Sequence, residues 1–198
     1  MRGGESDTLQ NSVTPHKKPR KLAAEELFEF AVKLLTLRGH STGELRTKLG
    51  RKAASRGDVD VAIARLNDVG YLDDKRYAES YASARVENEG FGRMRVLQDL
   101  RTRRISGKLA EQAVDQALEG RSESELIDAY IDRKMSSLVA AGPIEDEKKL
   151  ATAYRRLRRA GFTSGGILAA LKRKAASPEL VNDAPEEEET DPEANPGE

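Results

Sequence analysis

Apolar side chains recur at steps of three and four along most of this chain, as one face of an amphipathic helix requires. No alternation of apolar and polar residues persists long enough to indicate a strand. We therefore predict an all-α fold. The first apolar stripe consists of Leu27, Phe30, Ala31, Leu34, Leu35 and Leu37.

The same spacing of glycine, ring residue and aliphatic residues occurs three times without gaps, in residues 37–49, 88–100 and 159–171. In each copy an alanine stands eight positions before the glycine and a ring residue directly after it. Aliphatic residues stand six and ten positions after the glycine. We expect the glycine to close one helix, and the offsets of six and ten to turn the next helix toward it. The three sets are Ala31, Gly39, His40, Leu45 and Leu49; Ala82, Gly90, Phe91, Val96 and Leu100; and Ala153, Gly161, Phe162, Ile167 and Leu171.

This recurrence predicts three tandem three-helix repeats that stack into an elongated, curved body. Third helices are expected at 58–68 and 106–119, a further helix at 123–139, and a short last helix beginning at SPELV (177–181). The expected organisation is a disordered basic arm (1–21), repeat 1 (22–70), repeat 2 (71–120), a linker helix with repeat 3 (121–184) and a disordered acidic tail (185–198).

Several kinds of chemistry find no support in the composition. The chain has no cysteine and two histidines, which argues against disulfides, thiolate chemistry and a zinc site. The nearest phosphate-loop sequence, SGK at 106–108, lacks the first glycine and the final Ser or Thr. The longest apolar run, residues 167–171, is too short to cross a membrane. We expect a cytoplasmic protein that is not an enzyme and takes no cofactor, membrane or small-molecule substrate.

Charge is segregated along the chain, although the formal net charge is zero. Residues 179–198 contain nine acidic residues and no basic one, whereas residues 22–178 carry a net charge of +6. A basic body indicates an anionic partner. Two windows concentrate the charge: residues 93–108, with six basic residues against one acid, and residues 148–174, with nine basic residues and no acid.

For the first window, a solvated surface and a binding surface both remain open. For the second, contact with phosphates or with an acidic protein groove is favoured. Few aromatic residues interleave the basic ones, so sequence-independent phosphate contact is expected rather than base stacking. The candidate partner- or DNA-binding residues are Arg85, Arg93, Arg95, Arg101, Arg103, Arg104, Lys108, Arg155, Arg156, Arg158, Arg159, Lys172, Arg173 and Lys174.

The segment GYLDDKRYAESYASAR (70–85) contains three of the five tyrosines of the chain, and two of these, Tyr77 and Tyr81, lie four positions apart. Asp73 is expected to cap the helix that follows, and Tyr77, Tyr81 and Arg85 then share one helical stripe. We predict that this segment sets the geometry between the first two repeats. Its structural residues are Tyr71, Leu72, Asp73, Tyr77 and Tyr81.

With the glycine-centred turn and basic helix that follow it, this segment resembles the RecX family of regulatory proteins, which modulate the RecA recombinase. The resemblance spans residues 27–175 and leaves out the basic arm and the acidic tail. It implies three-helix repeats that bind in the groove of the RecA–DNA filament and inhibit its recombinase, ATPase and coprotease activities, and hence recombination, DNA repair and the SOS response. The matching residues are Tyr71, Leu72, Asp73, Asp74, Tyr77, Ala78, Tyr81, Arg85, Gly90, Arg93, Leu97, Leu100 and Ile105.

A different class of function also stays open. Three-helix units with short turns can resemble helix-turn-helix modules, so the chain is alternatively a regulator that binds DNA directly.

Overall fold

The computed structural model describes residues 20–140 and 142–177. Most of the predicted basic arm, the predicted acidic tail and most of SPELV lie outside these residues. Within them the fold is all-α, as predicted. Its elements are α1 (Ala24–Leu37), α2 (Thr42–Gly50), α3 (Arg56–Asp68), α4 (Asp74–Ala84), the π-helical turn η1 (Arg85–Glu89), α5 (Arg93–Thr102), α6 (Gly107–Leu118), α7 (Glu123–Lys134), α8 (Ser136–Val139), α9 (Glu147–Ala160) and α10 (Ser164–Lys174).

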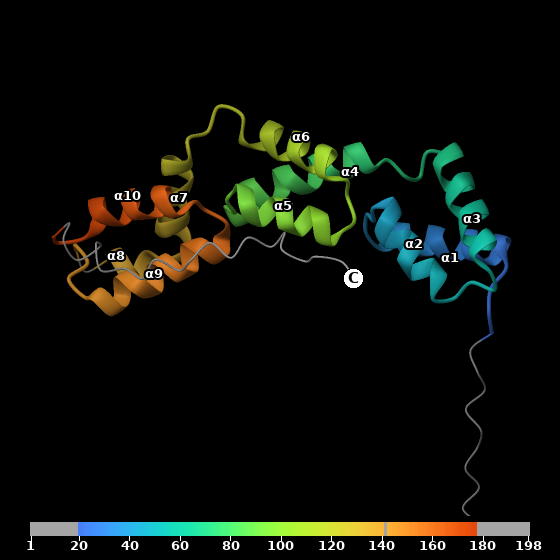
Figure 1. The fold of residues 1–198 in the computed structure, drawn as a ribbon, viewed down its shortest axis with the longest axis horizontal. Helices are drawn as coiled ribbons and strands as arrows, with labels where there is room; N and C mark the ends of the chain where they lie inside the picture. Colours follow the sequence, from blue (N-terminus) through green and yellow to red (C-terminus); the bar gives the residue numbers. More distant parts are fainter. Residues whose placement is uncertain (1–19, 141, 178–198) are drawn as a thin grey trace, which may run out of the picture.

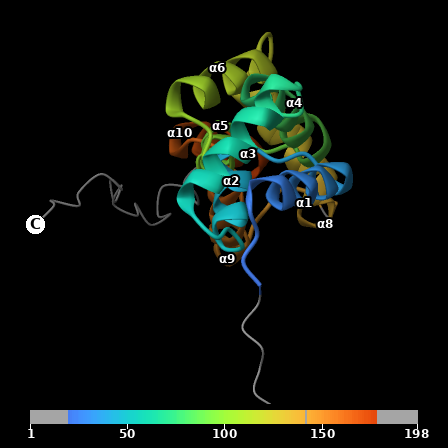
Figure 2. The same ribbon diagram turned by 90° about the vertical axis from the view of Figure 1, so that its right-hand side faces the viewer.

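The helices form an elongated body (Figure 1). The group α1–α3 lies at one end, α4–α6 in the middle and α7–α10 at the other end. Viewed from that first end, the groups overlie one another (Figure 2). The number of repeats and their bounds stay predictions, although the helices follow the predicted order.

Each group has its own buried cluster. The N-terminal cluster consists of Leu27, Ala31, Leu45, Leu49, Ala53, Val59, Ala62, Ile63, Leu66 and Leu72. The central cluster consists of Ala78, Ala82, Val86, Val96, Leu97, Leu100, Ile105, Ala110, Ala113 and Val114. The C-terminal cluster consists of Ile127, Tyr130, Ile131, Met135, Ile144, Leu150, Ala153, Tyr154, Leu157, Ala160, Phe162, Ile167, Ala170 and Leu171. Phe91 and Leu126 pack against both the central and the C-terminal clusters, and so connect them.

The recurring apolar positions of the sequence are core positions in all three groups. The three alanines, and the aliphatic residues six and ten places after each glycine, are all buried. An alanine at the closest helix contact lets two backbones approach, and the larger residues fill the space beside it. The burial expected from the spacing is therefore confirmed.

The first and third groups share a further backbone feature. Leu22 pairs with Ala53, and Ile144 pairs with Ala175, in two isolated parallel bridges of identical sequence separation. In each, the first residue donates its N–H to a carbonyl, at 2.8 and 2.9 Å, and accepts one in return. One bridge ties the chain before α1 to the chain after α2, and the other ties the chain before α9 to the chain after α10. At the corresponding place in the central group, Arg104 takes a left-handed conformation (φ 61°) instead.

Two expectations about helix ends need correction. Gly39 does not close α1 in a left-handed conformation, because the helix ends at Leu37 and Arg38 caps it in an extended one. The helix expected at 123–139 is broken at Met135, which separates α7 from α8. Gly90 and Gly161 do close the helices before them, in a left-handed conformation with φ of 71° and 92°.

Helices α9, α5 and α2 meet end to end along the body (Figure 1). At the first meeting point, the N–H groups of Gly92 and Met94 at the start of α5 donate to Ala160 and Gly161 at the end of α9, at 2.8 and 3.1 Å. At the second, the hydroxyl of Ser41, which caps α2, donates to the carbonyl of Arg103 at the end of α5. The first junction pairs backbone N–H groups at the start of one helix with carbonyls at the end of another, and at the second the donor is a capping hydroxyl.

Candidate functional site

Eight of the fourteen candidate basic residues are held by groups inside the protein. Six pair with carboxylates: Arg85 and Arg95 with Asp99, Arg93 with Asp115, Arg103 with Glu44, and Arg173 and Lys174 with Asp128. Two donate to backbone carbonyls, Arg156 to Lys134 at 2.7 Å and Arg158 to Phe162 at 3.2 Å. These contacts give the residues structural tasks, so the candidate set is not one uniform binding surface.

The side chains of the other six candidates make no ion pair or hydrogen bond within the part of the chain that the structure describes. All are exposed. A guanidinium or ammonium group without an internal partner keeps its full charge for an external anion. These residues are Arg101, Arg104, Lys108, Arg155, Arg159 and Lys172.

One groove gathers both kinds of arginine where α5 meets α9. It has a volume of about 470 Å³ and is lined by Met94, Arg95, Leu97, Gln98, Arg101, Arg158, Arg159 and Gly161. Arg101 comes from the end of α5 and Arg159 from the end of α9, 58 residues away in sequence. Met94 is 55% exposed, which is unusual for a large apolar side chain beside arginines. The groove offers four guanidinium groups around a small apolar floor.

A polar joint connects the first two helix groups. Arg103 donates to Glu44 at 3.3 Å and to the hydroxyl of Tyr77 at 3.0 Å, and it lies 4.4 Å from the ring centre of Tyr81. Although burial opposes the shift, the hydrogen bond from Arg38 and the nearby arginine charges lower the pKa of Glu44. A carboxylate held ionised between two guanidinium groups fixes α2 against α4 and α5.

The segment 70–85 lies at this joint. Asp73 caps α4, since its carboxylate accepts from the N–H of Arg76 at 2.9 Å. The rings of Tyr77 and Tyr81 stack at 6.1 Å, and Arg85 donates to the hydroxyl of Tyr81 at 2.8 Å. Leu72 is buried in the N-terminal cluster, whereas Tyr71 is 55% exposed.

Sequence reasoning missed the acceptors of the joint. Glu44 lies 59 residues from Arg103, and Asp74, which accepts from the N–H of Thr42 at 2.7 Å, lies 32 residues from it. No local spacing signals contacts over such separations. The isolated acid among the basic residues of 93–108, Asp99, was the one visible hint, and it pairs with Arg85 and Arg95.

His40 is buried beside the joint as a neutral ring. Its Nδ1 lies 2.9 Å from the carbonyl oxygen of Arg38, which can only accept, so Nδ1 carries the proton. Its Nε2 accepts from the ammonium of Lys48 at 2.7 Å. Burial lowers the pKa of His40 below its ordinary value of 6.5, and the charges of Arg38 and Lys48 act in the same direction, against the hydrogen bond to the Arg38 carbonyl and the charge of Glu44.

This lowered pKa predicts a loss of stability in mild acid. Below pH 6.5 the unfolded chain takes up a proton that folded His40 resists, so the free energy of unfolding falls as the pH drops, until the folded pKa is passed. Urea unfolding between pH 7.5 and 5 should show this fall. His40→Phe introduces the ring that follows Gly90 and Gly161 in the other two helix groups, and it should flatten the curve. An unchanged pH dependence in His40→Phe would contradict the assignment.

Within the described ranges, no helix has the length and apolar character that a membrane span needs. The same residues contain no group of three or more His, Asp or Glu side chains able to hold a metal ion.

Comparison with known proteins begins with a family model. The model "RecX, second three-helix domain" matches residues 73–114, which contain α4, η1 and α5 and most of α6. The protein named Regulatory protein RecX from Vibrio parahaemolyticus is 33% identical over 143 residues, covering 72% of this chain and 88% of the relative. Its namesake from Halorhodospira halophila is 32% identical over 148 residues, covering 75% and 88%.

Two solved structures share the fold. A crystal structure of regulatory protein RecX aligns with a TM-score of 0.58 at 19% identity, covering 76% of this chain and 71% of the other. RecX from Lactobacillus salivarius aligns with a TM-score of 0.56 at 19% identity, covering 76% and 95%. At this identity the likeness concerns the fold alone.

Fold and groove together define an elongated, all-α protein that presents clustered arginine side chains. The extent and identity of the sequence matches then settle the family. This chain belongs to the RecX family of regulatory proteins.

Proposed function

We propose that this protein binds the RecA filament on DNA and inhibits its recombinase, ATPase and coprotease activities, in the cytoplasm. It would thereby restrain recombination, DNA repair and the SOS response. Membership of the RecX family supports this proposal. The observation that carries it is the arginine groove between α5 and α9, where Arg101 and Arg159 have no internal partner among the described residues.

The chemistry of the groove suits a nucleoprotein filament. Guanidinium groups form charge-assisted hydrogen bonds with phosphate and with carboxylate, so DNA and acidic protein surfaces both fit. Met94 and Leu97 add apolar area, which favours a protein partner beside the phosphates. An elongated body in the filament groove would obstruct access of the second DNA strand.

The direct test is a titration of the protein into strand-exchange and DNA-dependent ATPase reactions of its cognate recombinase. We expect both activities to fall at or below one protein per recombinase protomer, because an elongated body in the filament groove would contact more than one protomer. Full activity at equimolar protein would refute the proposal.

The second candidate, a regulator that binds DNA directly, is favoured by the three-helix organisation of the segment that the family model matches. It requires sequence-selective binding to naked duplex. A filament regulator should bind duplex weakly, without sequence preference and with a steep dependence on salt. Mobility shifts with specific and random competitor DNA separate the two candidates.

A further inference from the structure

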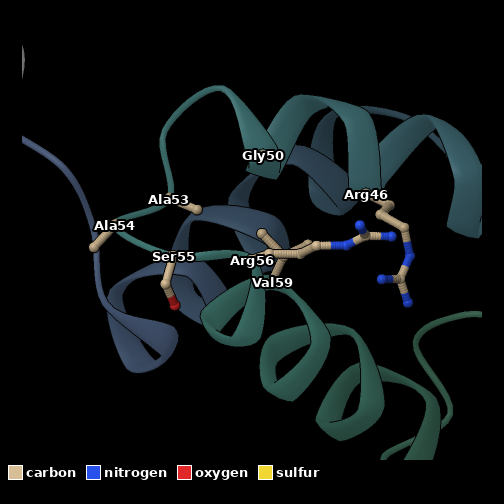
Figure 3. Close-up of a pocket in the computed structure, with 7 residues that line it drawn as sticks. All are labelled: Arg46, Gly50, Ala53, Ala54, Ser55, Arg56 and Val59. Atoms are coloured by element: carbon tan, nitrogen blue, oxygen red, sulfur yellow. The ribbon is translucent and has the colours of Figure 1, made fainter.

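A second basic pocket lies far from the α5–α9 groove, between α2 and α3. It has a volume of about 500 Å³ (Figure 3). Its walls come from the C-terminal half of α2, the loop that follows, and the first turns of α3. The lining residues are Arg46, Gly50, Ala53, Ala54, Ser55, Arg56 and Val59.

Two guanidinium groups converge at this pocket. Arg46 comes from α2 and Arg56 is the first residue of α3, and Figure 3 shows their side chains extending toward each other. Two like charges repel unless an anion lies nearby. Arg46 has such a partner in Asp60, whereas Arg56 has no ion pair or hydrogen bond from its side chain in the described ranges.

The other nearby carboxylate is already engaged. Asp58 accepts from the N–H and the hydroxyl of Ser55, at 3.0 and 2.7 Å, in the capping box of α3. In Figure 3 the hydroxyl of Ser55 points away from the guanidinium groups. Asp60 pairs with Arg46, so the positive charge of Arg56 has no ion-pair partner among the described residues.

The sequence around the pocket strengthens this excess of charge. Residues 45–57 contain five basic residues and no acidic one. Of these, Lys48 is engaged with His40, and Lys52 lies 5.1 Å from the ring centre of Phe30. The predicted binding set does not include this window, which is shorter than the two basic windows further along the chain.

The walls of the pocket indicate which kind of anion fits. Apart from the arginines they are small and uncharged, and no aromatic ring lines the pocket, so a nucleobase finds no surface to stack on. Two guanidinium forks facing one space match the oxygens of a phosphate group. The lining of the pocket therefore suits a phosphate group and offers no surface that would recognise a base or a sugar.

We propose that Arg46 and Arg56 together hold one backbone phosphate of a nucleic acid. A polymer is favoured over free phosphate because the α5–α9 groove offers further cations on the same chain, and a second contact by one polymer is strengthened by its effective concentration. The site needs no recombinase, so it extends the proposed function without depending on it. Its test also uses no recombinase, so either proposal can fail alone.

The first experiment measures the salt dependence of duplex binding by the full chain. Each phosphate contact contributes about 0.9 to the slope of log K against log salt. We expect Arg56→Ala to lower this slope by about 0.9. Arg56→Lys, which keeps the charge, should retain most of it. The double variant Arg46→Ala/Arg56→Ala should lose no more than Arg56→Ala alone, because both side chains hold the same phosphate.

Arg51→Ala is the matched control. Arg51 is exposed, lies five residues from both arginines and does not line the pocket, yet its loss changes the net charge equally. Its slope should equal that of the wild type. An unchanged slope in Arg56→Ala, or an equal loss in Arg51→Ala, would overturn the proposal. Circular dichroism of each variant checks that the fold is intact.

A second measurement distinguishes the source of the phosphate. The NMR signals of the Arg46 and Arg56 side-chain N–H groups are followed during titration with a short duplex and with inorganic phosphate. We expect both ligands to shift these signals, with the duplex acting at a far lower concentration. A response to inorganic phosphate alone would replace the nucleic acid by a free anion and overturn the assignment, and no response to either would remove the site.

Discussion

Changing Arg101, Arg158 and Arg159 to glutamate together should weaken inhibition of the recombinase by about 100-fold or more. The triple change replaces three positive charges by negative ones in a single groove. Loss of well-placed charge contacts costs about 2–5 kcal/mol, and each 1.4 kcal/mol is a factor of ten in affinity. Strand-exchange titrations give the shift in the concentration for half inhibition.

The control carries the same change of net charge away from the groove. Lys33, Arg51 and Arg76 are exposed on α1, after α2 and on α4, and none of them lines the groove. Their triple change to glutamate should shift inhibition by less than about tenfold, through long-range electrostatics alone. Equal losses in both triples would show that net charge, rather than the groove, carries the binding.

Gly161→Ala should lower the free energy of unfolding by about 2–4 kcal/mol. A left-handed backbone costs an alanine about 1 kcal/mol or somewhat more, and forcing a methyl group into a packed site adds about 1–3 kcal/mol. A Cβ at Gly161, where φ is 92°, would collide with the backbone of Arg95 on α5. Gly92→Ala should cost about 1–3 kcal/mol, since its Cβ would lie 2.5 Å from the carbonyl oxygen of Gly161.

Urea unfolding measures both changes, and the double variant should lose less than the two losses added together, because both residues lie at one junction. Gly165→Ala is the control. Gly165 lies in the first turn of α10 with nothing within 4 Å of a built Cβ, so alanine should be neutral or slightly stabilising. A Gly161→Ala protein as stable as the wild type would mean that the α9–α5 junction is looser than the structure has it.

The periodicity of the sequence was sufficient to predict the helices and their buried faces. Side chains three and four positions apart lie on the same face of a helix. Apolar residues at such spacings, as at Leu45 and Leu49, therefore indicate a buried face directly. The cap at Asp73 was equally legible, because capping depends on residues within one turn. Helix periodicity and capping depend on residues that are close together in the chain, so the sequence alone is sufficient to predict them.

The tasks of the arginines could not be predicted in the same way. Arg103 and Arg101 are two residues apart in one basic window, yet the first is tied to Glu44 from another helix group and the second is free among the described residues. Their difference depends on which helix packs alongside, which is a property of the tertiary structure. The prediction for Gly39 was wrong for a similar reason: the position lies at the joint, where a Cβ added to Gly39 would come 3.4 Å from the ring of Tyr77, and α1 ends at Leu37, two residues before Gly39.

The end-to-end order of α9, α5 and α2 has a consequence for any partner that is itself a directional polymer. The end of α9 meets the start of α5, and the end of α5 meets the start of α2, so the three helices run in the same direction. Their aligned peptide dipoles make one end of this row positive and the other end negative. Turning such a body around does not superimpose it on itself. Copies bound along one strand would therefore all have the same orientation relative to the direction of that strand.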